Sequence, residues 1–216
     1  MIRCEAPQGS QDWLIDRLGI PTGSQFHRLL TPRLKPSASA TAYLYELLAD
    51  DYAPMPQGDS AGAWADRGIE MEAEAVKWYE FDRDAKVEQV GFILTDDGKT
   101  GGSPDGLVGD DGGVEIKCKK LTTHIGYLLG EDEHAHRCQC QGYLWLTGRK
   151  WWDLVFYNPV LPPVVRRYEP EQEWLDAFLP ELEAFQARLS DARTRLRDEY
   201  GLKVRAILAE EGNDEV

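Results

Sequence analysis

Two acidic residues and one lysine near the middle of the chain have the types and spacing for metal-dependent phosphodiester chemistry. Asp105 follows a Ser-Pro dipeptide, and the run Glu115-Ile116-Lys117 begins ten residues later. Carboxylates suit a hard cation such as Mg²⁺, and a nearby ammonium group can orient water and stabilise phosphoryl charge. The same spacing also fits a solvent-exposed hairpin with one salt bridge, so the pattern alone leaves both interpretations open.

A β-hairpin would bring these residues together. The segments SPDGLV and GVEIK are expected to form an antiparallel pair of strands joined at the turn GDDGG. Residues two apart on a strand point to the same side, so Glu115 and Lys117 share one face. Val114 and Ile116 share the other face, which is expected to lie in the core. Asp105 would approach from the neighbouring strand.

The rest of the pattern predicts a mixed β-sheet with helices on both sides, which is an α/β fold. Helices are expected over residues 10–19, 21–30, 40–52, 61–81, 133–147 and 171 to about 208, the last with breaks at Pro180 and near Gly201. Besides the hairpin, strands are expected over residues 86–94, 151–159 and 164–170. The acidic tail, residues 209–216, is expected to fray.

Length and composition indicate one cytoplasmic domain that spans residues 1–216. No apolar run approaches the ~18–20 residues that a membrane-spanning helix needs. The first residues, MIRCEAPQGS, have no export signal, so we expect a cytosolic protein with four reduced cysteines.

The net charge of −14 argues against loose, non-specific binding to DNA. Its distribution is uneven, because residues 1–36 and residues 115–150 each carry a net +2, whereas residues 37–114 carry −12 and residues 151–216 carry −6. The two mildly basic segments also hold most of the candidate motifs. An acidic total is therefore compatible with a locally positive groove.

Four ordered stretches together resemble the phage lambda exonuclease and YqaJ-like viral recombinase family. These stretches are QGSQDWLIDRLGIPTGS (8–24), GIEMEAEA (68–75), SPDGLVGDDGGVEIKC (103–118) and CQCQGYLWLTGRKWW (138–152). The family consists of PD-(D/E)xK nucleases with the restriction-endonuclease-like fold, a central mixed sheet flanked by helices. The resemblance runs from about Gln8 to Pro159, and the C-terminal helix carries no matching motif.

The resemblance implies roles for the residues of the hairpin. Asp105 and Glu115 match the metal-binding acids, and the backbone carbonyl of Ile116 would complete the metal shell. Lys117 matches the catalytic lysine. The implied cofactor is Mg²⁺, or Mn²⁺ in its place.

Further residues match the family outside the hairpin. Glu72 matches a helical acid that faces the same metal site, although by itself it also fits a solvated helical carboxylate. Gln139, with Tyr143 one helical turn later, matches the glutamine motif that borders the site.

Arg17 and Ser24 match the family's N-terminal motif, and the resemblance implies a DNA-binding role for them. Arg17 and Ser24, together with Ser103, would hold the 5′-phosphate of a DNA end, because the planar guanidinium engages phosphate oxygens in pairs. A helix-end salt bridge from Arg17 to Asp12 or Asp16 is the alternative interpretation.

The function implied by the resemblance is a Mg²⁺-dependent 5′→3′ exonuclease that degrades one strand of linear duplex DNA. The 3′ overhangs would serve recombination by single-strand annealing. Duplex DNA ends, two further copies in a homotrimer and a single-strand annealing protein are the implied partners. A structure- or site-selective endonuclease of the same fold and a catalytically silent DNA-binding scaffold are the alternatives.

A cluster of possible zinc ligands overlaps the glutamine motif. His134, His136, Cys138 and Cys140 alternate along the chain. On a helix they form two pairs on faces about 200° apart, at 100° per residue, so one helix cannot close a tetrahedron with them. We interpret them as packing and surface residues.

Overall fold

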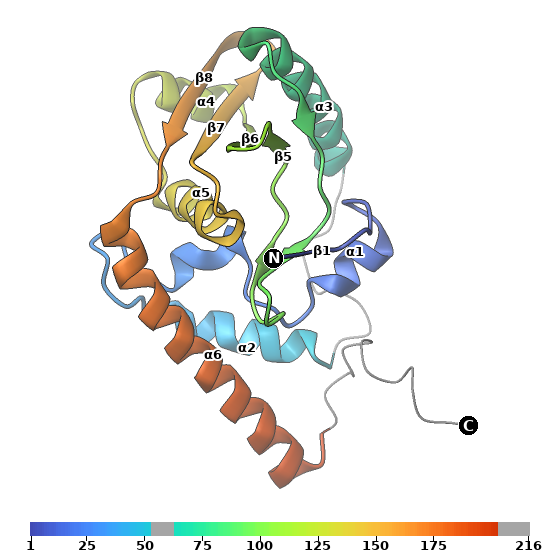
Figure 1. Ribbon diagram of the computed structural model, residues 1–216, viewed down its shortest axis with the longest axis vertical. Coiled ribbons are helices and arrows are strands. Elements are labelled where there is room, and N and C mark those ends of the chain that lie inside the picture. The colour runs from blue at the N-terminus through green and yellow to red at the C-terminus, as the bar shows by residue number, and fades with distance from the viewer. Residues whose placement is uncertain (53–62, 203–216) are drawn as a thin grey trace.

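A five-stranded mixed sheet is the main sheet of the computed structural model, which describes residues 1–52 and 63–202, and it lies in the upper part of the view in Figure 1. Of residues 63–70 it describes the backbone only. The order of the strands is β2-β5-β6-β7-β8, and all neighbours are antiparallel except β6 and β7, which are parallel. The strands are β2 (Val87–Glu88), β5 (Gly106–Val108), β6 (Gly112–Cys118), β7 (Trp151–Asn158) and β8 (Leu161–Tyr168).

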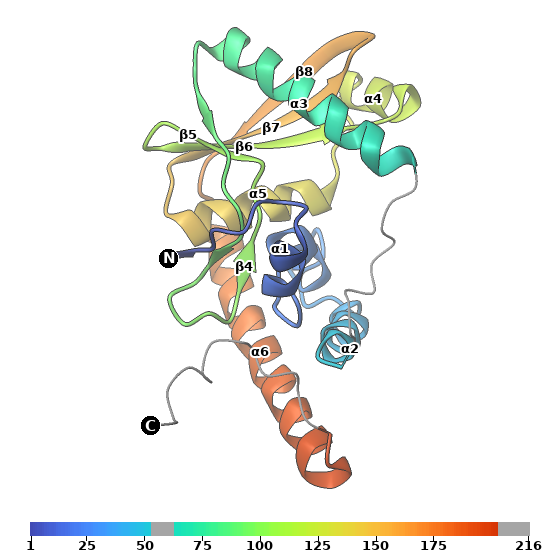
Figure 2. The ribbon, with the colours of Figure 1, turned by 90° about the vertical axis from the view of Figure 1, so that its right-hand side faces the viewer.

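Helices cover both faces of this sheet (Figure 2). On one face lies α3 (Ala63–Arg83), whose Ala75 and Tyr79 pack against Val114 and Ile116 of β6. On the other lie α4 (Leu121–Leu128) and α5 (His134–Thr147). This architecture confirms the predicted α/β fold.

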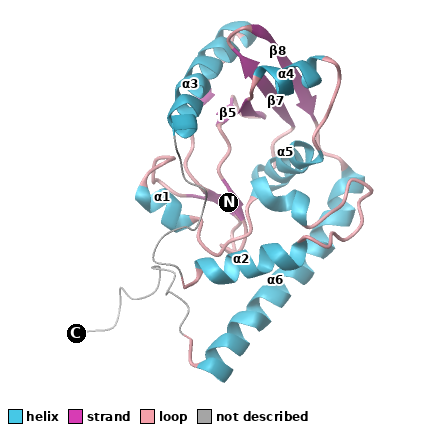
Figure 3. Ribbon diagram, turned by 180° about the vertical axis from the view of Figure 1, so that it is seen from behind, coloured by secondary structure: helices cyan, strands magenta, loops and turns pink. Residues whose placement is uncertain are grey.

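A helical layer packs on the far side of α5. It contains the 3₁₀-helix η1 (Gly23–Arg28), α2 (Ala40–Asp50) and α6 (Gln172–Tyr200). The buried face of α6 packs beside α2, as Figure 3 shows from behind. The N-terminal helix α1 (Gln11–Asp16) begins at Ser10, whose hydroxyl accepts the Trp13 N–H.

A small second sheet connects the N-terminal segment to the main sheet. Its strands are β1 (Ile2–Arg3), β3 (Ile93–Leu94) and β4 (Gly101–Gly102), in the order β1-β3-β4. A parallel bridge between Thr22 and Gly101 places η1 next to β4. Because β4 leads directly into β5, this contact sets the N-terminal motif against the hairpin.

The predicted hairpin is confirmed. Strands β5 and β6 pair antiparallel, with Gly106 opposite Val114, and the turn between them contains Gly109 at φ +53°. Glycine suits that turn because a side chain disfavours positive φ.

Three predicted elements differ from the structure, and one further helix was not predicted. The expected strand over residues 86–94 is split between β2 and β3, which belong to different sheets. The predicted break at Pro180 is wrong, since α6 continues through it and ends at Gly201. Helix α4 was not expected, and the second short helix is a 3₁₀-helix.

Pro180 is tolerated because its side of the helix faces solvent. The buried stripe of α6 runs past it on the opposite side and packs into one apolar cluster, which holds both halves of the helix in line. Water can then satisfy the carbonyl that loses its helical donor.

Three parts of the chain lie outside the described residues: the segment 53–62, the expected continuation of the C-terminal helix beyond residue 202, and the expected acidic tail. None of the described helices is both long and apolar enough to span a bilayer. All four cysteines are free thiols.

Candidate active site

Strand β6 carries the acid and the lysine on one face, as predicted. Glu115 is 2% exposed, and its Oε1 accepts hydrogen bonds from Lys117 Nζ at 2.6 Å and from Gln139 Nε2 at 2.7 Å. The second oxygen, Oε2, is buried without any hydrogen-bond partner in the structure. A buried carboxylate oxygen without a donor is costly, so this atom is available to a ligand.

Asp105 lies at the edge of β6 that β5 leaves open. Because β5 begins at Gly106, no described strand pairs with β6 on that side beyond Val114, and the Ile116 N–H donates to Asp105 Oδ2 at 2.6 Å. The N–H and the C=O of one strand residue lie on the same edge. The Ile116 carbonyl is therefore directed to the same side as the Asp105 carboxylate.

Carboxylates crowd this part of the molecule. Burial raises the pKa of Asp105 well above its ordinary value, and the charge of Glu115 raises it further. Burial and the charge of Glu115 also raise the pKa of Glu72, a half-buried residue of α3. The structure thus brings the predicted helical acid within electrostatic reach of the hairpin.

Lys117 supplies a positive charge at the centre of this cluster. Burial by itself lowers the pKa of its ammonium group, but attraction to Glu115 and Asp105 outweighs burial, so the pKa is raised. Lys117 therefore carries its proton at neutral pH.

Tyr143 links the acid cluster to the N-terminal motif. Its hydroxyl accepts from Gln139 Nε2 at 3.0 Å and donates to the Ser103 carbonyl at 3.1 Å. A Cβ atom on Gly23 or on Gly102 would meet the Tyr143 ring at 2.6 or 2.5 Å. Glycines at these two positions let both backbones contact the ring, and the ring thereby sets how far apart they lie.

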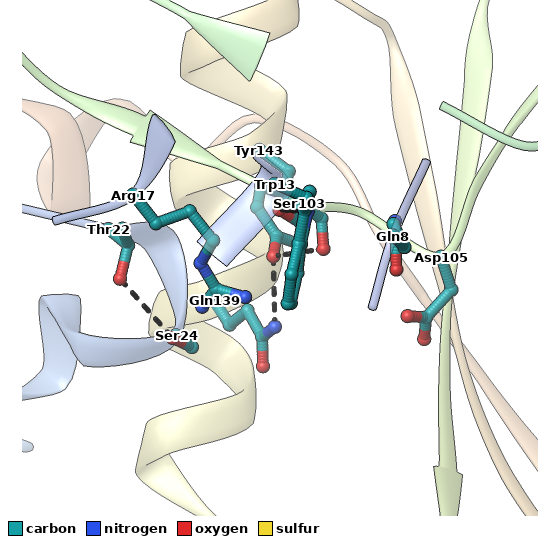
Figure 4. Close-up of a pocket in the computed structure, with 9 residues that line it drawn as sticks. All are labelled: Gln8, Trp13, Arg17, Thr22, Ser24, Ser103, Asp105, Gln139 and Tyr143. Carbon is teal, nitrogen blue, oxygen red and sulfur yellow. Dashed lines mark hydrogen bonds between the residues drawn. The ribbon is translucent and has the colours of Figure 1, made fainter. Parts of the chain in front are cut away.

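A pocket of about 190 Å³ opens beside Asp105 (Figure 4). The Arg17 guanidinium stacks over the Trp13 ring at 4.1 Å from its centroid, and Trp13 Nε1 donates to Ser103 Oγ at 2.9 Å. Across the described residues Arg17 forms no ion pair, so the alternative salt bridge to Asp12 or Asp16 is absent there. The lining residues are Gln8, Trp13, Arg17, Thr22, Ser24, Ser103, Asp105, Gln139 and Tyr143.

The structure brings most of the candidate site residues into this one region. Arg17, Ser24 and Ser103 line the pocket together with Asp105 and Gln139. Glu115 is connected to the pocket by its hydrogen bond from Gln139, and Lys117 in turn bonds Glu115. Glu72 interacts with Glu115 through charge.

Gln8 is a pocket residue to which sequence reasoning assigned no role. Its side-chain amide donates to the carbonyls of Val90 and Pro104, both at 2.8 Å, and so fixes the backbone just before Asp105. Its place at the start of the N-terminal stretch was the only signal.

The alternating histidines and cysteines of α5 divide between two packing environments. Cys138 is buried in the cluster with α6, and Cys140 in the cluster with the sheet. His134 Nε2 lies 2.8 Å from the Leu30 carbonyl. Over the described part of the chain, no three His, Cys, Asp or Glu side chains converge into a metal site. A cation at the hairpin would therefore need backbone and water oxygens as well.

Comparisons with known proteins give consistent results. The model of the YqaJ-like viral recombinase domain family matches residues 12–150. An alkaline exonuclease, LHK-Exo, from Laribacter hongkongensis is similar in structure, with a TM-score of 0.79 and 30% identity over 89% of this chain and 98% of that one. LHK-Exo in complex with dAMP matches to the same extent.

A phage related exonuclease from Haemophilus somnus 129PT shares the fold, with a TM-score of 0.64 and 14% identity over 82% of this chain and 96% of that one. No curated protein matches the chain by sequence.

Proposed function

Because the chain belongs to the YqaJ-like viral recombinase domain family, we propose that it is a Mg²⁺-dependent 5′→3′ exonuclease that acts on the ends of duplex DNA. Its fold is the restriction-endonuclease-like fold, as the resemblance implied. Family membership and the likeness to alkaline exonucleases support a nuclease. The observation that carries the finer proposal is a pocket that Arg17 and Asp105 line together, next to the buried Glu115 and to Lys117, with no ion pair on Arg17 across the described residues.

Mg²⁺ fits the oxygen donors at the hairpin. Glu115 Oε2, the Asp105 carboxylate and the Ile116 carbonyl would hold it, and these are the hard ligands that Mg²⁺ prefers. When bound, the cation supplies Lewis-acid activation of the scissile phosphate and of a water. The orphaned Oε2 atom supports this fit, because a buried carboxylate oxygen otherwise has nothing to bind.

Lys117 stabilises negative charge in this proposal. Since its pKa is raised by Glu115 and Asp105, the ammonium form persists and the side chain cannot readily accept a proton. Its proton instead stays on Nζ, where it orients a water and attracts the phosphoryl oxygens. Gln139 donates a second hydrogen bond to the same Glu115 oxygen and so holds the carboxylate in place.

Arg17, Ser24 and Ser103 form the binding site for the 5′-phosphate. The guanidinium is half-buried on the Trp13 ring, and burial lowers its pKa without removing its charge. A partly desolvated cation that has no counter-ion among the described residues favours a doubly charged terminal phosphate. An endonuclease has no use for such a pocket, so this feature favours an exonuclease.

A comparison of DNA ends tests this proposal. Duplex with a 5′-phosphate should be degraded faster than duplex with a 5′-hydroxyl in Mg²⁺, and neither should be degraded in EDTA. Arg17→Ala should lower the ratio of the rates on 5′-phosphate and 5′-hydroxyl ends by roughly 10- to 150-fold, because a charge-assisted contact contributes about 1.5–3 kcal/mol. Arg28→Ala is the matched control, since Arg28 also lies over an aromatic ring but pairs with Glu46 away from the pocket.

Three outcomes would contradict parts of the proposal. Equal rates on both ends in the unaltered enzyme would refute the phosphate pocket. Cleavage of closed circular duplex would favour an endonuclease of the same fold. Binding without cleavage in either Mg²⁺ or Mn²⁺ would favour a silent scaffold.

The proposed assembly is a homotrimer that encloses the duplex in the cytoplasm of a bacterium or phage-infected host. A chain with a net charge of −14 binds DNA weakly by charge alone, and a closed ring would hold the duplex by topology instead. The pocket residues come mostly from the two mildly basic segments, which supports DNA contact there. Light scattering on a sizing column measures the mass, and a strict monomer would refute the ring.

The proposed partner is a single-strand annealing protein, which would take up the 3′ overhang as the opposite strand is removed. Co-elution of the two proteins on a sizing column would test that association.

A further inference from the structure

The C-terminal helix α6 reaches the segment that carries the phosphate pocket. Arg193 Nη2 donates to the Gly19 carbonyl at 2.7 Å. The same guanidinium donates to both oxygens of Asp51, from Nε to Oδ2 at 2.7 Å and from Nη2 to Oδ1 at 2.8 Å. Arg193 lies outside residues 12–150, which the family model matches, and no predicted motif includes it.

The contact is closely fitted and largely enclosed. The Asp51 side chain is 6% exposed, and Gly19 adopts φ +68°. A Cβ atom on Gly19 would meet Asp51 Oδ1 at 2.4 Å and Arg193 Nη2 at 2.7 Å. The Gly19 backbone also hydrogen-bonds the Asp50 carboxylate. The Gly19 backbone is therefore gripped by both α6 and the end of α2.

This grip lies in the middle of the pocket-forming segment. Arg17 is the C-cap of α1, two residues before Gly19, and the Ile20 N–H points back to the Arg17 carbonyl at 3.4 Å. After Gly19, the Pro21 carbonyl accepts from Gly101 at 3.0 Å, which ties the chain to β4. The position of Gly19 thus determines where α1 ends and in which direction the Arg17 side chain extends from the backbone.

We propose that Arg193 and Asp51 are positioning residues for the 5′-phosphate pocket, which they control by fixing the Gly19 carbonyl. This inference rests on the proposed function and extends it to the C-terminal helix. The two side chains act through the backbone, since neither lines the pocket. A small displacement of a binding group is enough to matter, because a misplacement of 1 Å can cost about 100-fold in rate.

The test measures kcat/KM on 5′-phosphate and 5′-hydroxyl duplex ends for Arg193→Met, Arg193→Lys and the unaltered enzyme. Arg193→Met should lower the ratio of the two values by about tenfold or more, towards the ~100-fold limit of such a displacement. Arg193→Lys should retain an intermediate ratio, because an ammonium group can reach either Asp51 or Gly19 but lacks the fork that engages both. The loss should appear mainly as a higher KM for the phosphorylated end.

Two further variants separate positioning from general stability. Arg188→Met removes another link between α6 and α2, the bond from Arg188 to Thr41 Oγ1, and should retain the full ratio. Gly19→Ala leaves both positioning side chains in place but forces the backbone away from them, so it should lower the ratio as Arg193→Met does. Thermal melts show which variants remain folded.

The outcomes distinguish this inference from the function on which it rests. If the unaltered enzyme shows no preference for the 5′-phosphate, the pocket and the positioning role both fall. If it shows the preference and folded Arg193→Met and Arg193→Lys keep it, with equal loss on both ends, the ion pair is a structural tie only. The positioning role is then overturned while the pocket stands.

Discussion

Replacement of Asp105 by asparagine should stabilise the metal-free protein while it abolishes cleavage. Asp105 Oδ2 accepts the Ile116 N–H at 2.6 Å, and an asparagine oxygen can accept the same bond, so no backbone donor is left unpaired. The substitution removes a charge that burial and Glu115 both disfavour. Lys117 and the Ile116 hydrogen bond favour the charged carboxylate, but the pKa of Asp105 is raised despite them. Removal of the charge should therefore increase the free energy of unfolding.

The expected gain is about 0.5–2 kcal/mol in the free energy of unfolding, the range that single stabilising substitutions commonly reach. In a chain of this size each kcal/mol raises Tm by about 2–4 °C. Asp111→Asn is the matched control. Asp111 is an exposed acid of the same hairpin that pairs with Lys150, and such a surface pair contributes about 0–1 kcal/mol.

The gain should depend on pH in a defined direction. A carboxyl group whose folded pKa is raised destabilises the fold above that pKa, and this penalty fades as the pH falls towards the unfolded value of about 3.9. The advantage of Asp105→Asn should therefore be largest in alkaline buffer and shrink in acid. Urea unfolding in EDTA at pH 8 and pH 5 measures it.

Added Mg²⁺ should reverse the order of stability. A ligand at 100 times its Kd stabilises the folded state by about 2.7 kcal/mol, and the unaltered protein should gain more of this than the asparagine variant. Lower stability of Asp105→Asn in EDTA at pH 8, or a gain that does not change with pH, would refute the electrostatic reasoning.

Three further predictions follow from the same structure. Lys117→Ala should abolish cleavage yet retain Mg²⁺ binding by calorimetry, and substantial Mg²⁺-dependent activity would remove the lysine from the mechanism. Burial and the charge of Lys117 lower the pKa of His136 from 6.5 to about 4. As the pH falls, this histidine is therefore protonated in the unfolded chain before it is protonated in the folded protein. The free energy of unfolding should decrease below about pH 6.5, by at most about 1.4 kcal/mol per pH unit. His136→Gln should flatten that slope in urea unfolding, and parallel profiles would contradict the assignment. Arg167→Met should destabilise the fold more than Asp153→Asn, because it removes the cation that bonds the 1%-exposed Asp153 carboxylate and leaves it only the Tyr79 hydroxyl among the donors described, whereas asparagine removes the charge. Thermal melts that show the reverse order would refute this.

Local patterns predicted the parts of the site that local structure assembles. Asp105, Glu115 and Lys117 lie on one hairpin, whose turn chemistry and alternation are visible in a short stretch of sequence. Arg17 and Ser103 are far apart in the chain, and only the resemblance to a family placed them together. Both residues line one pocket, and its shape depends on the Tyr143 ring lying against Gly102 and Gly23, a packing that no sequence period reveals.

The elements that were missed or misassigned depend on tertiary contacts. The N-terminus of helix α4 has no side-chain capping hydrogen bond within the described structure, and its buried His124 bonds the Pro162 carbonyl of strand β8. The expected strand over residues 86–94 divides near Gly91, where a Cβ atom would meet the carbonyls of Cys4 and Ala6 at 2.7 and 2.5 Å. Each outcome was decided by a segment distant in sequence, so propensity and periodicity carried no signal for it.

The bond from Arg193 to Gly19 also affects when, during its synthesis, the protein becomes able to bind DNA ends. It joins residues 174 apart, and contacts of such separation form late because a long loop must close first. At roughly 5–20 residues per second, Arg193 leaves the ribosome about 10–35 s after Gly19. Throughout that interval the segment with Arg17 exists without its anchor. We therefore expect a nascent chain to bind DNA ends poorly until Arg193 has emerged, so that chains stopped before that residue do not compete for broken DNA with chains that include it.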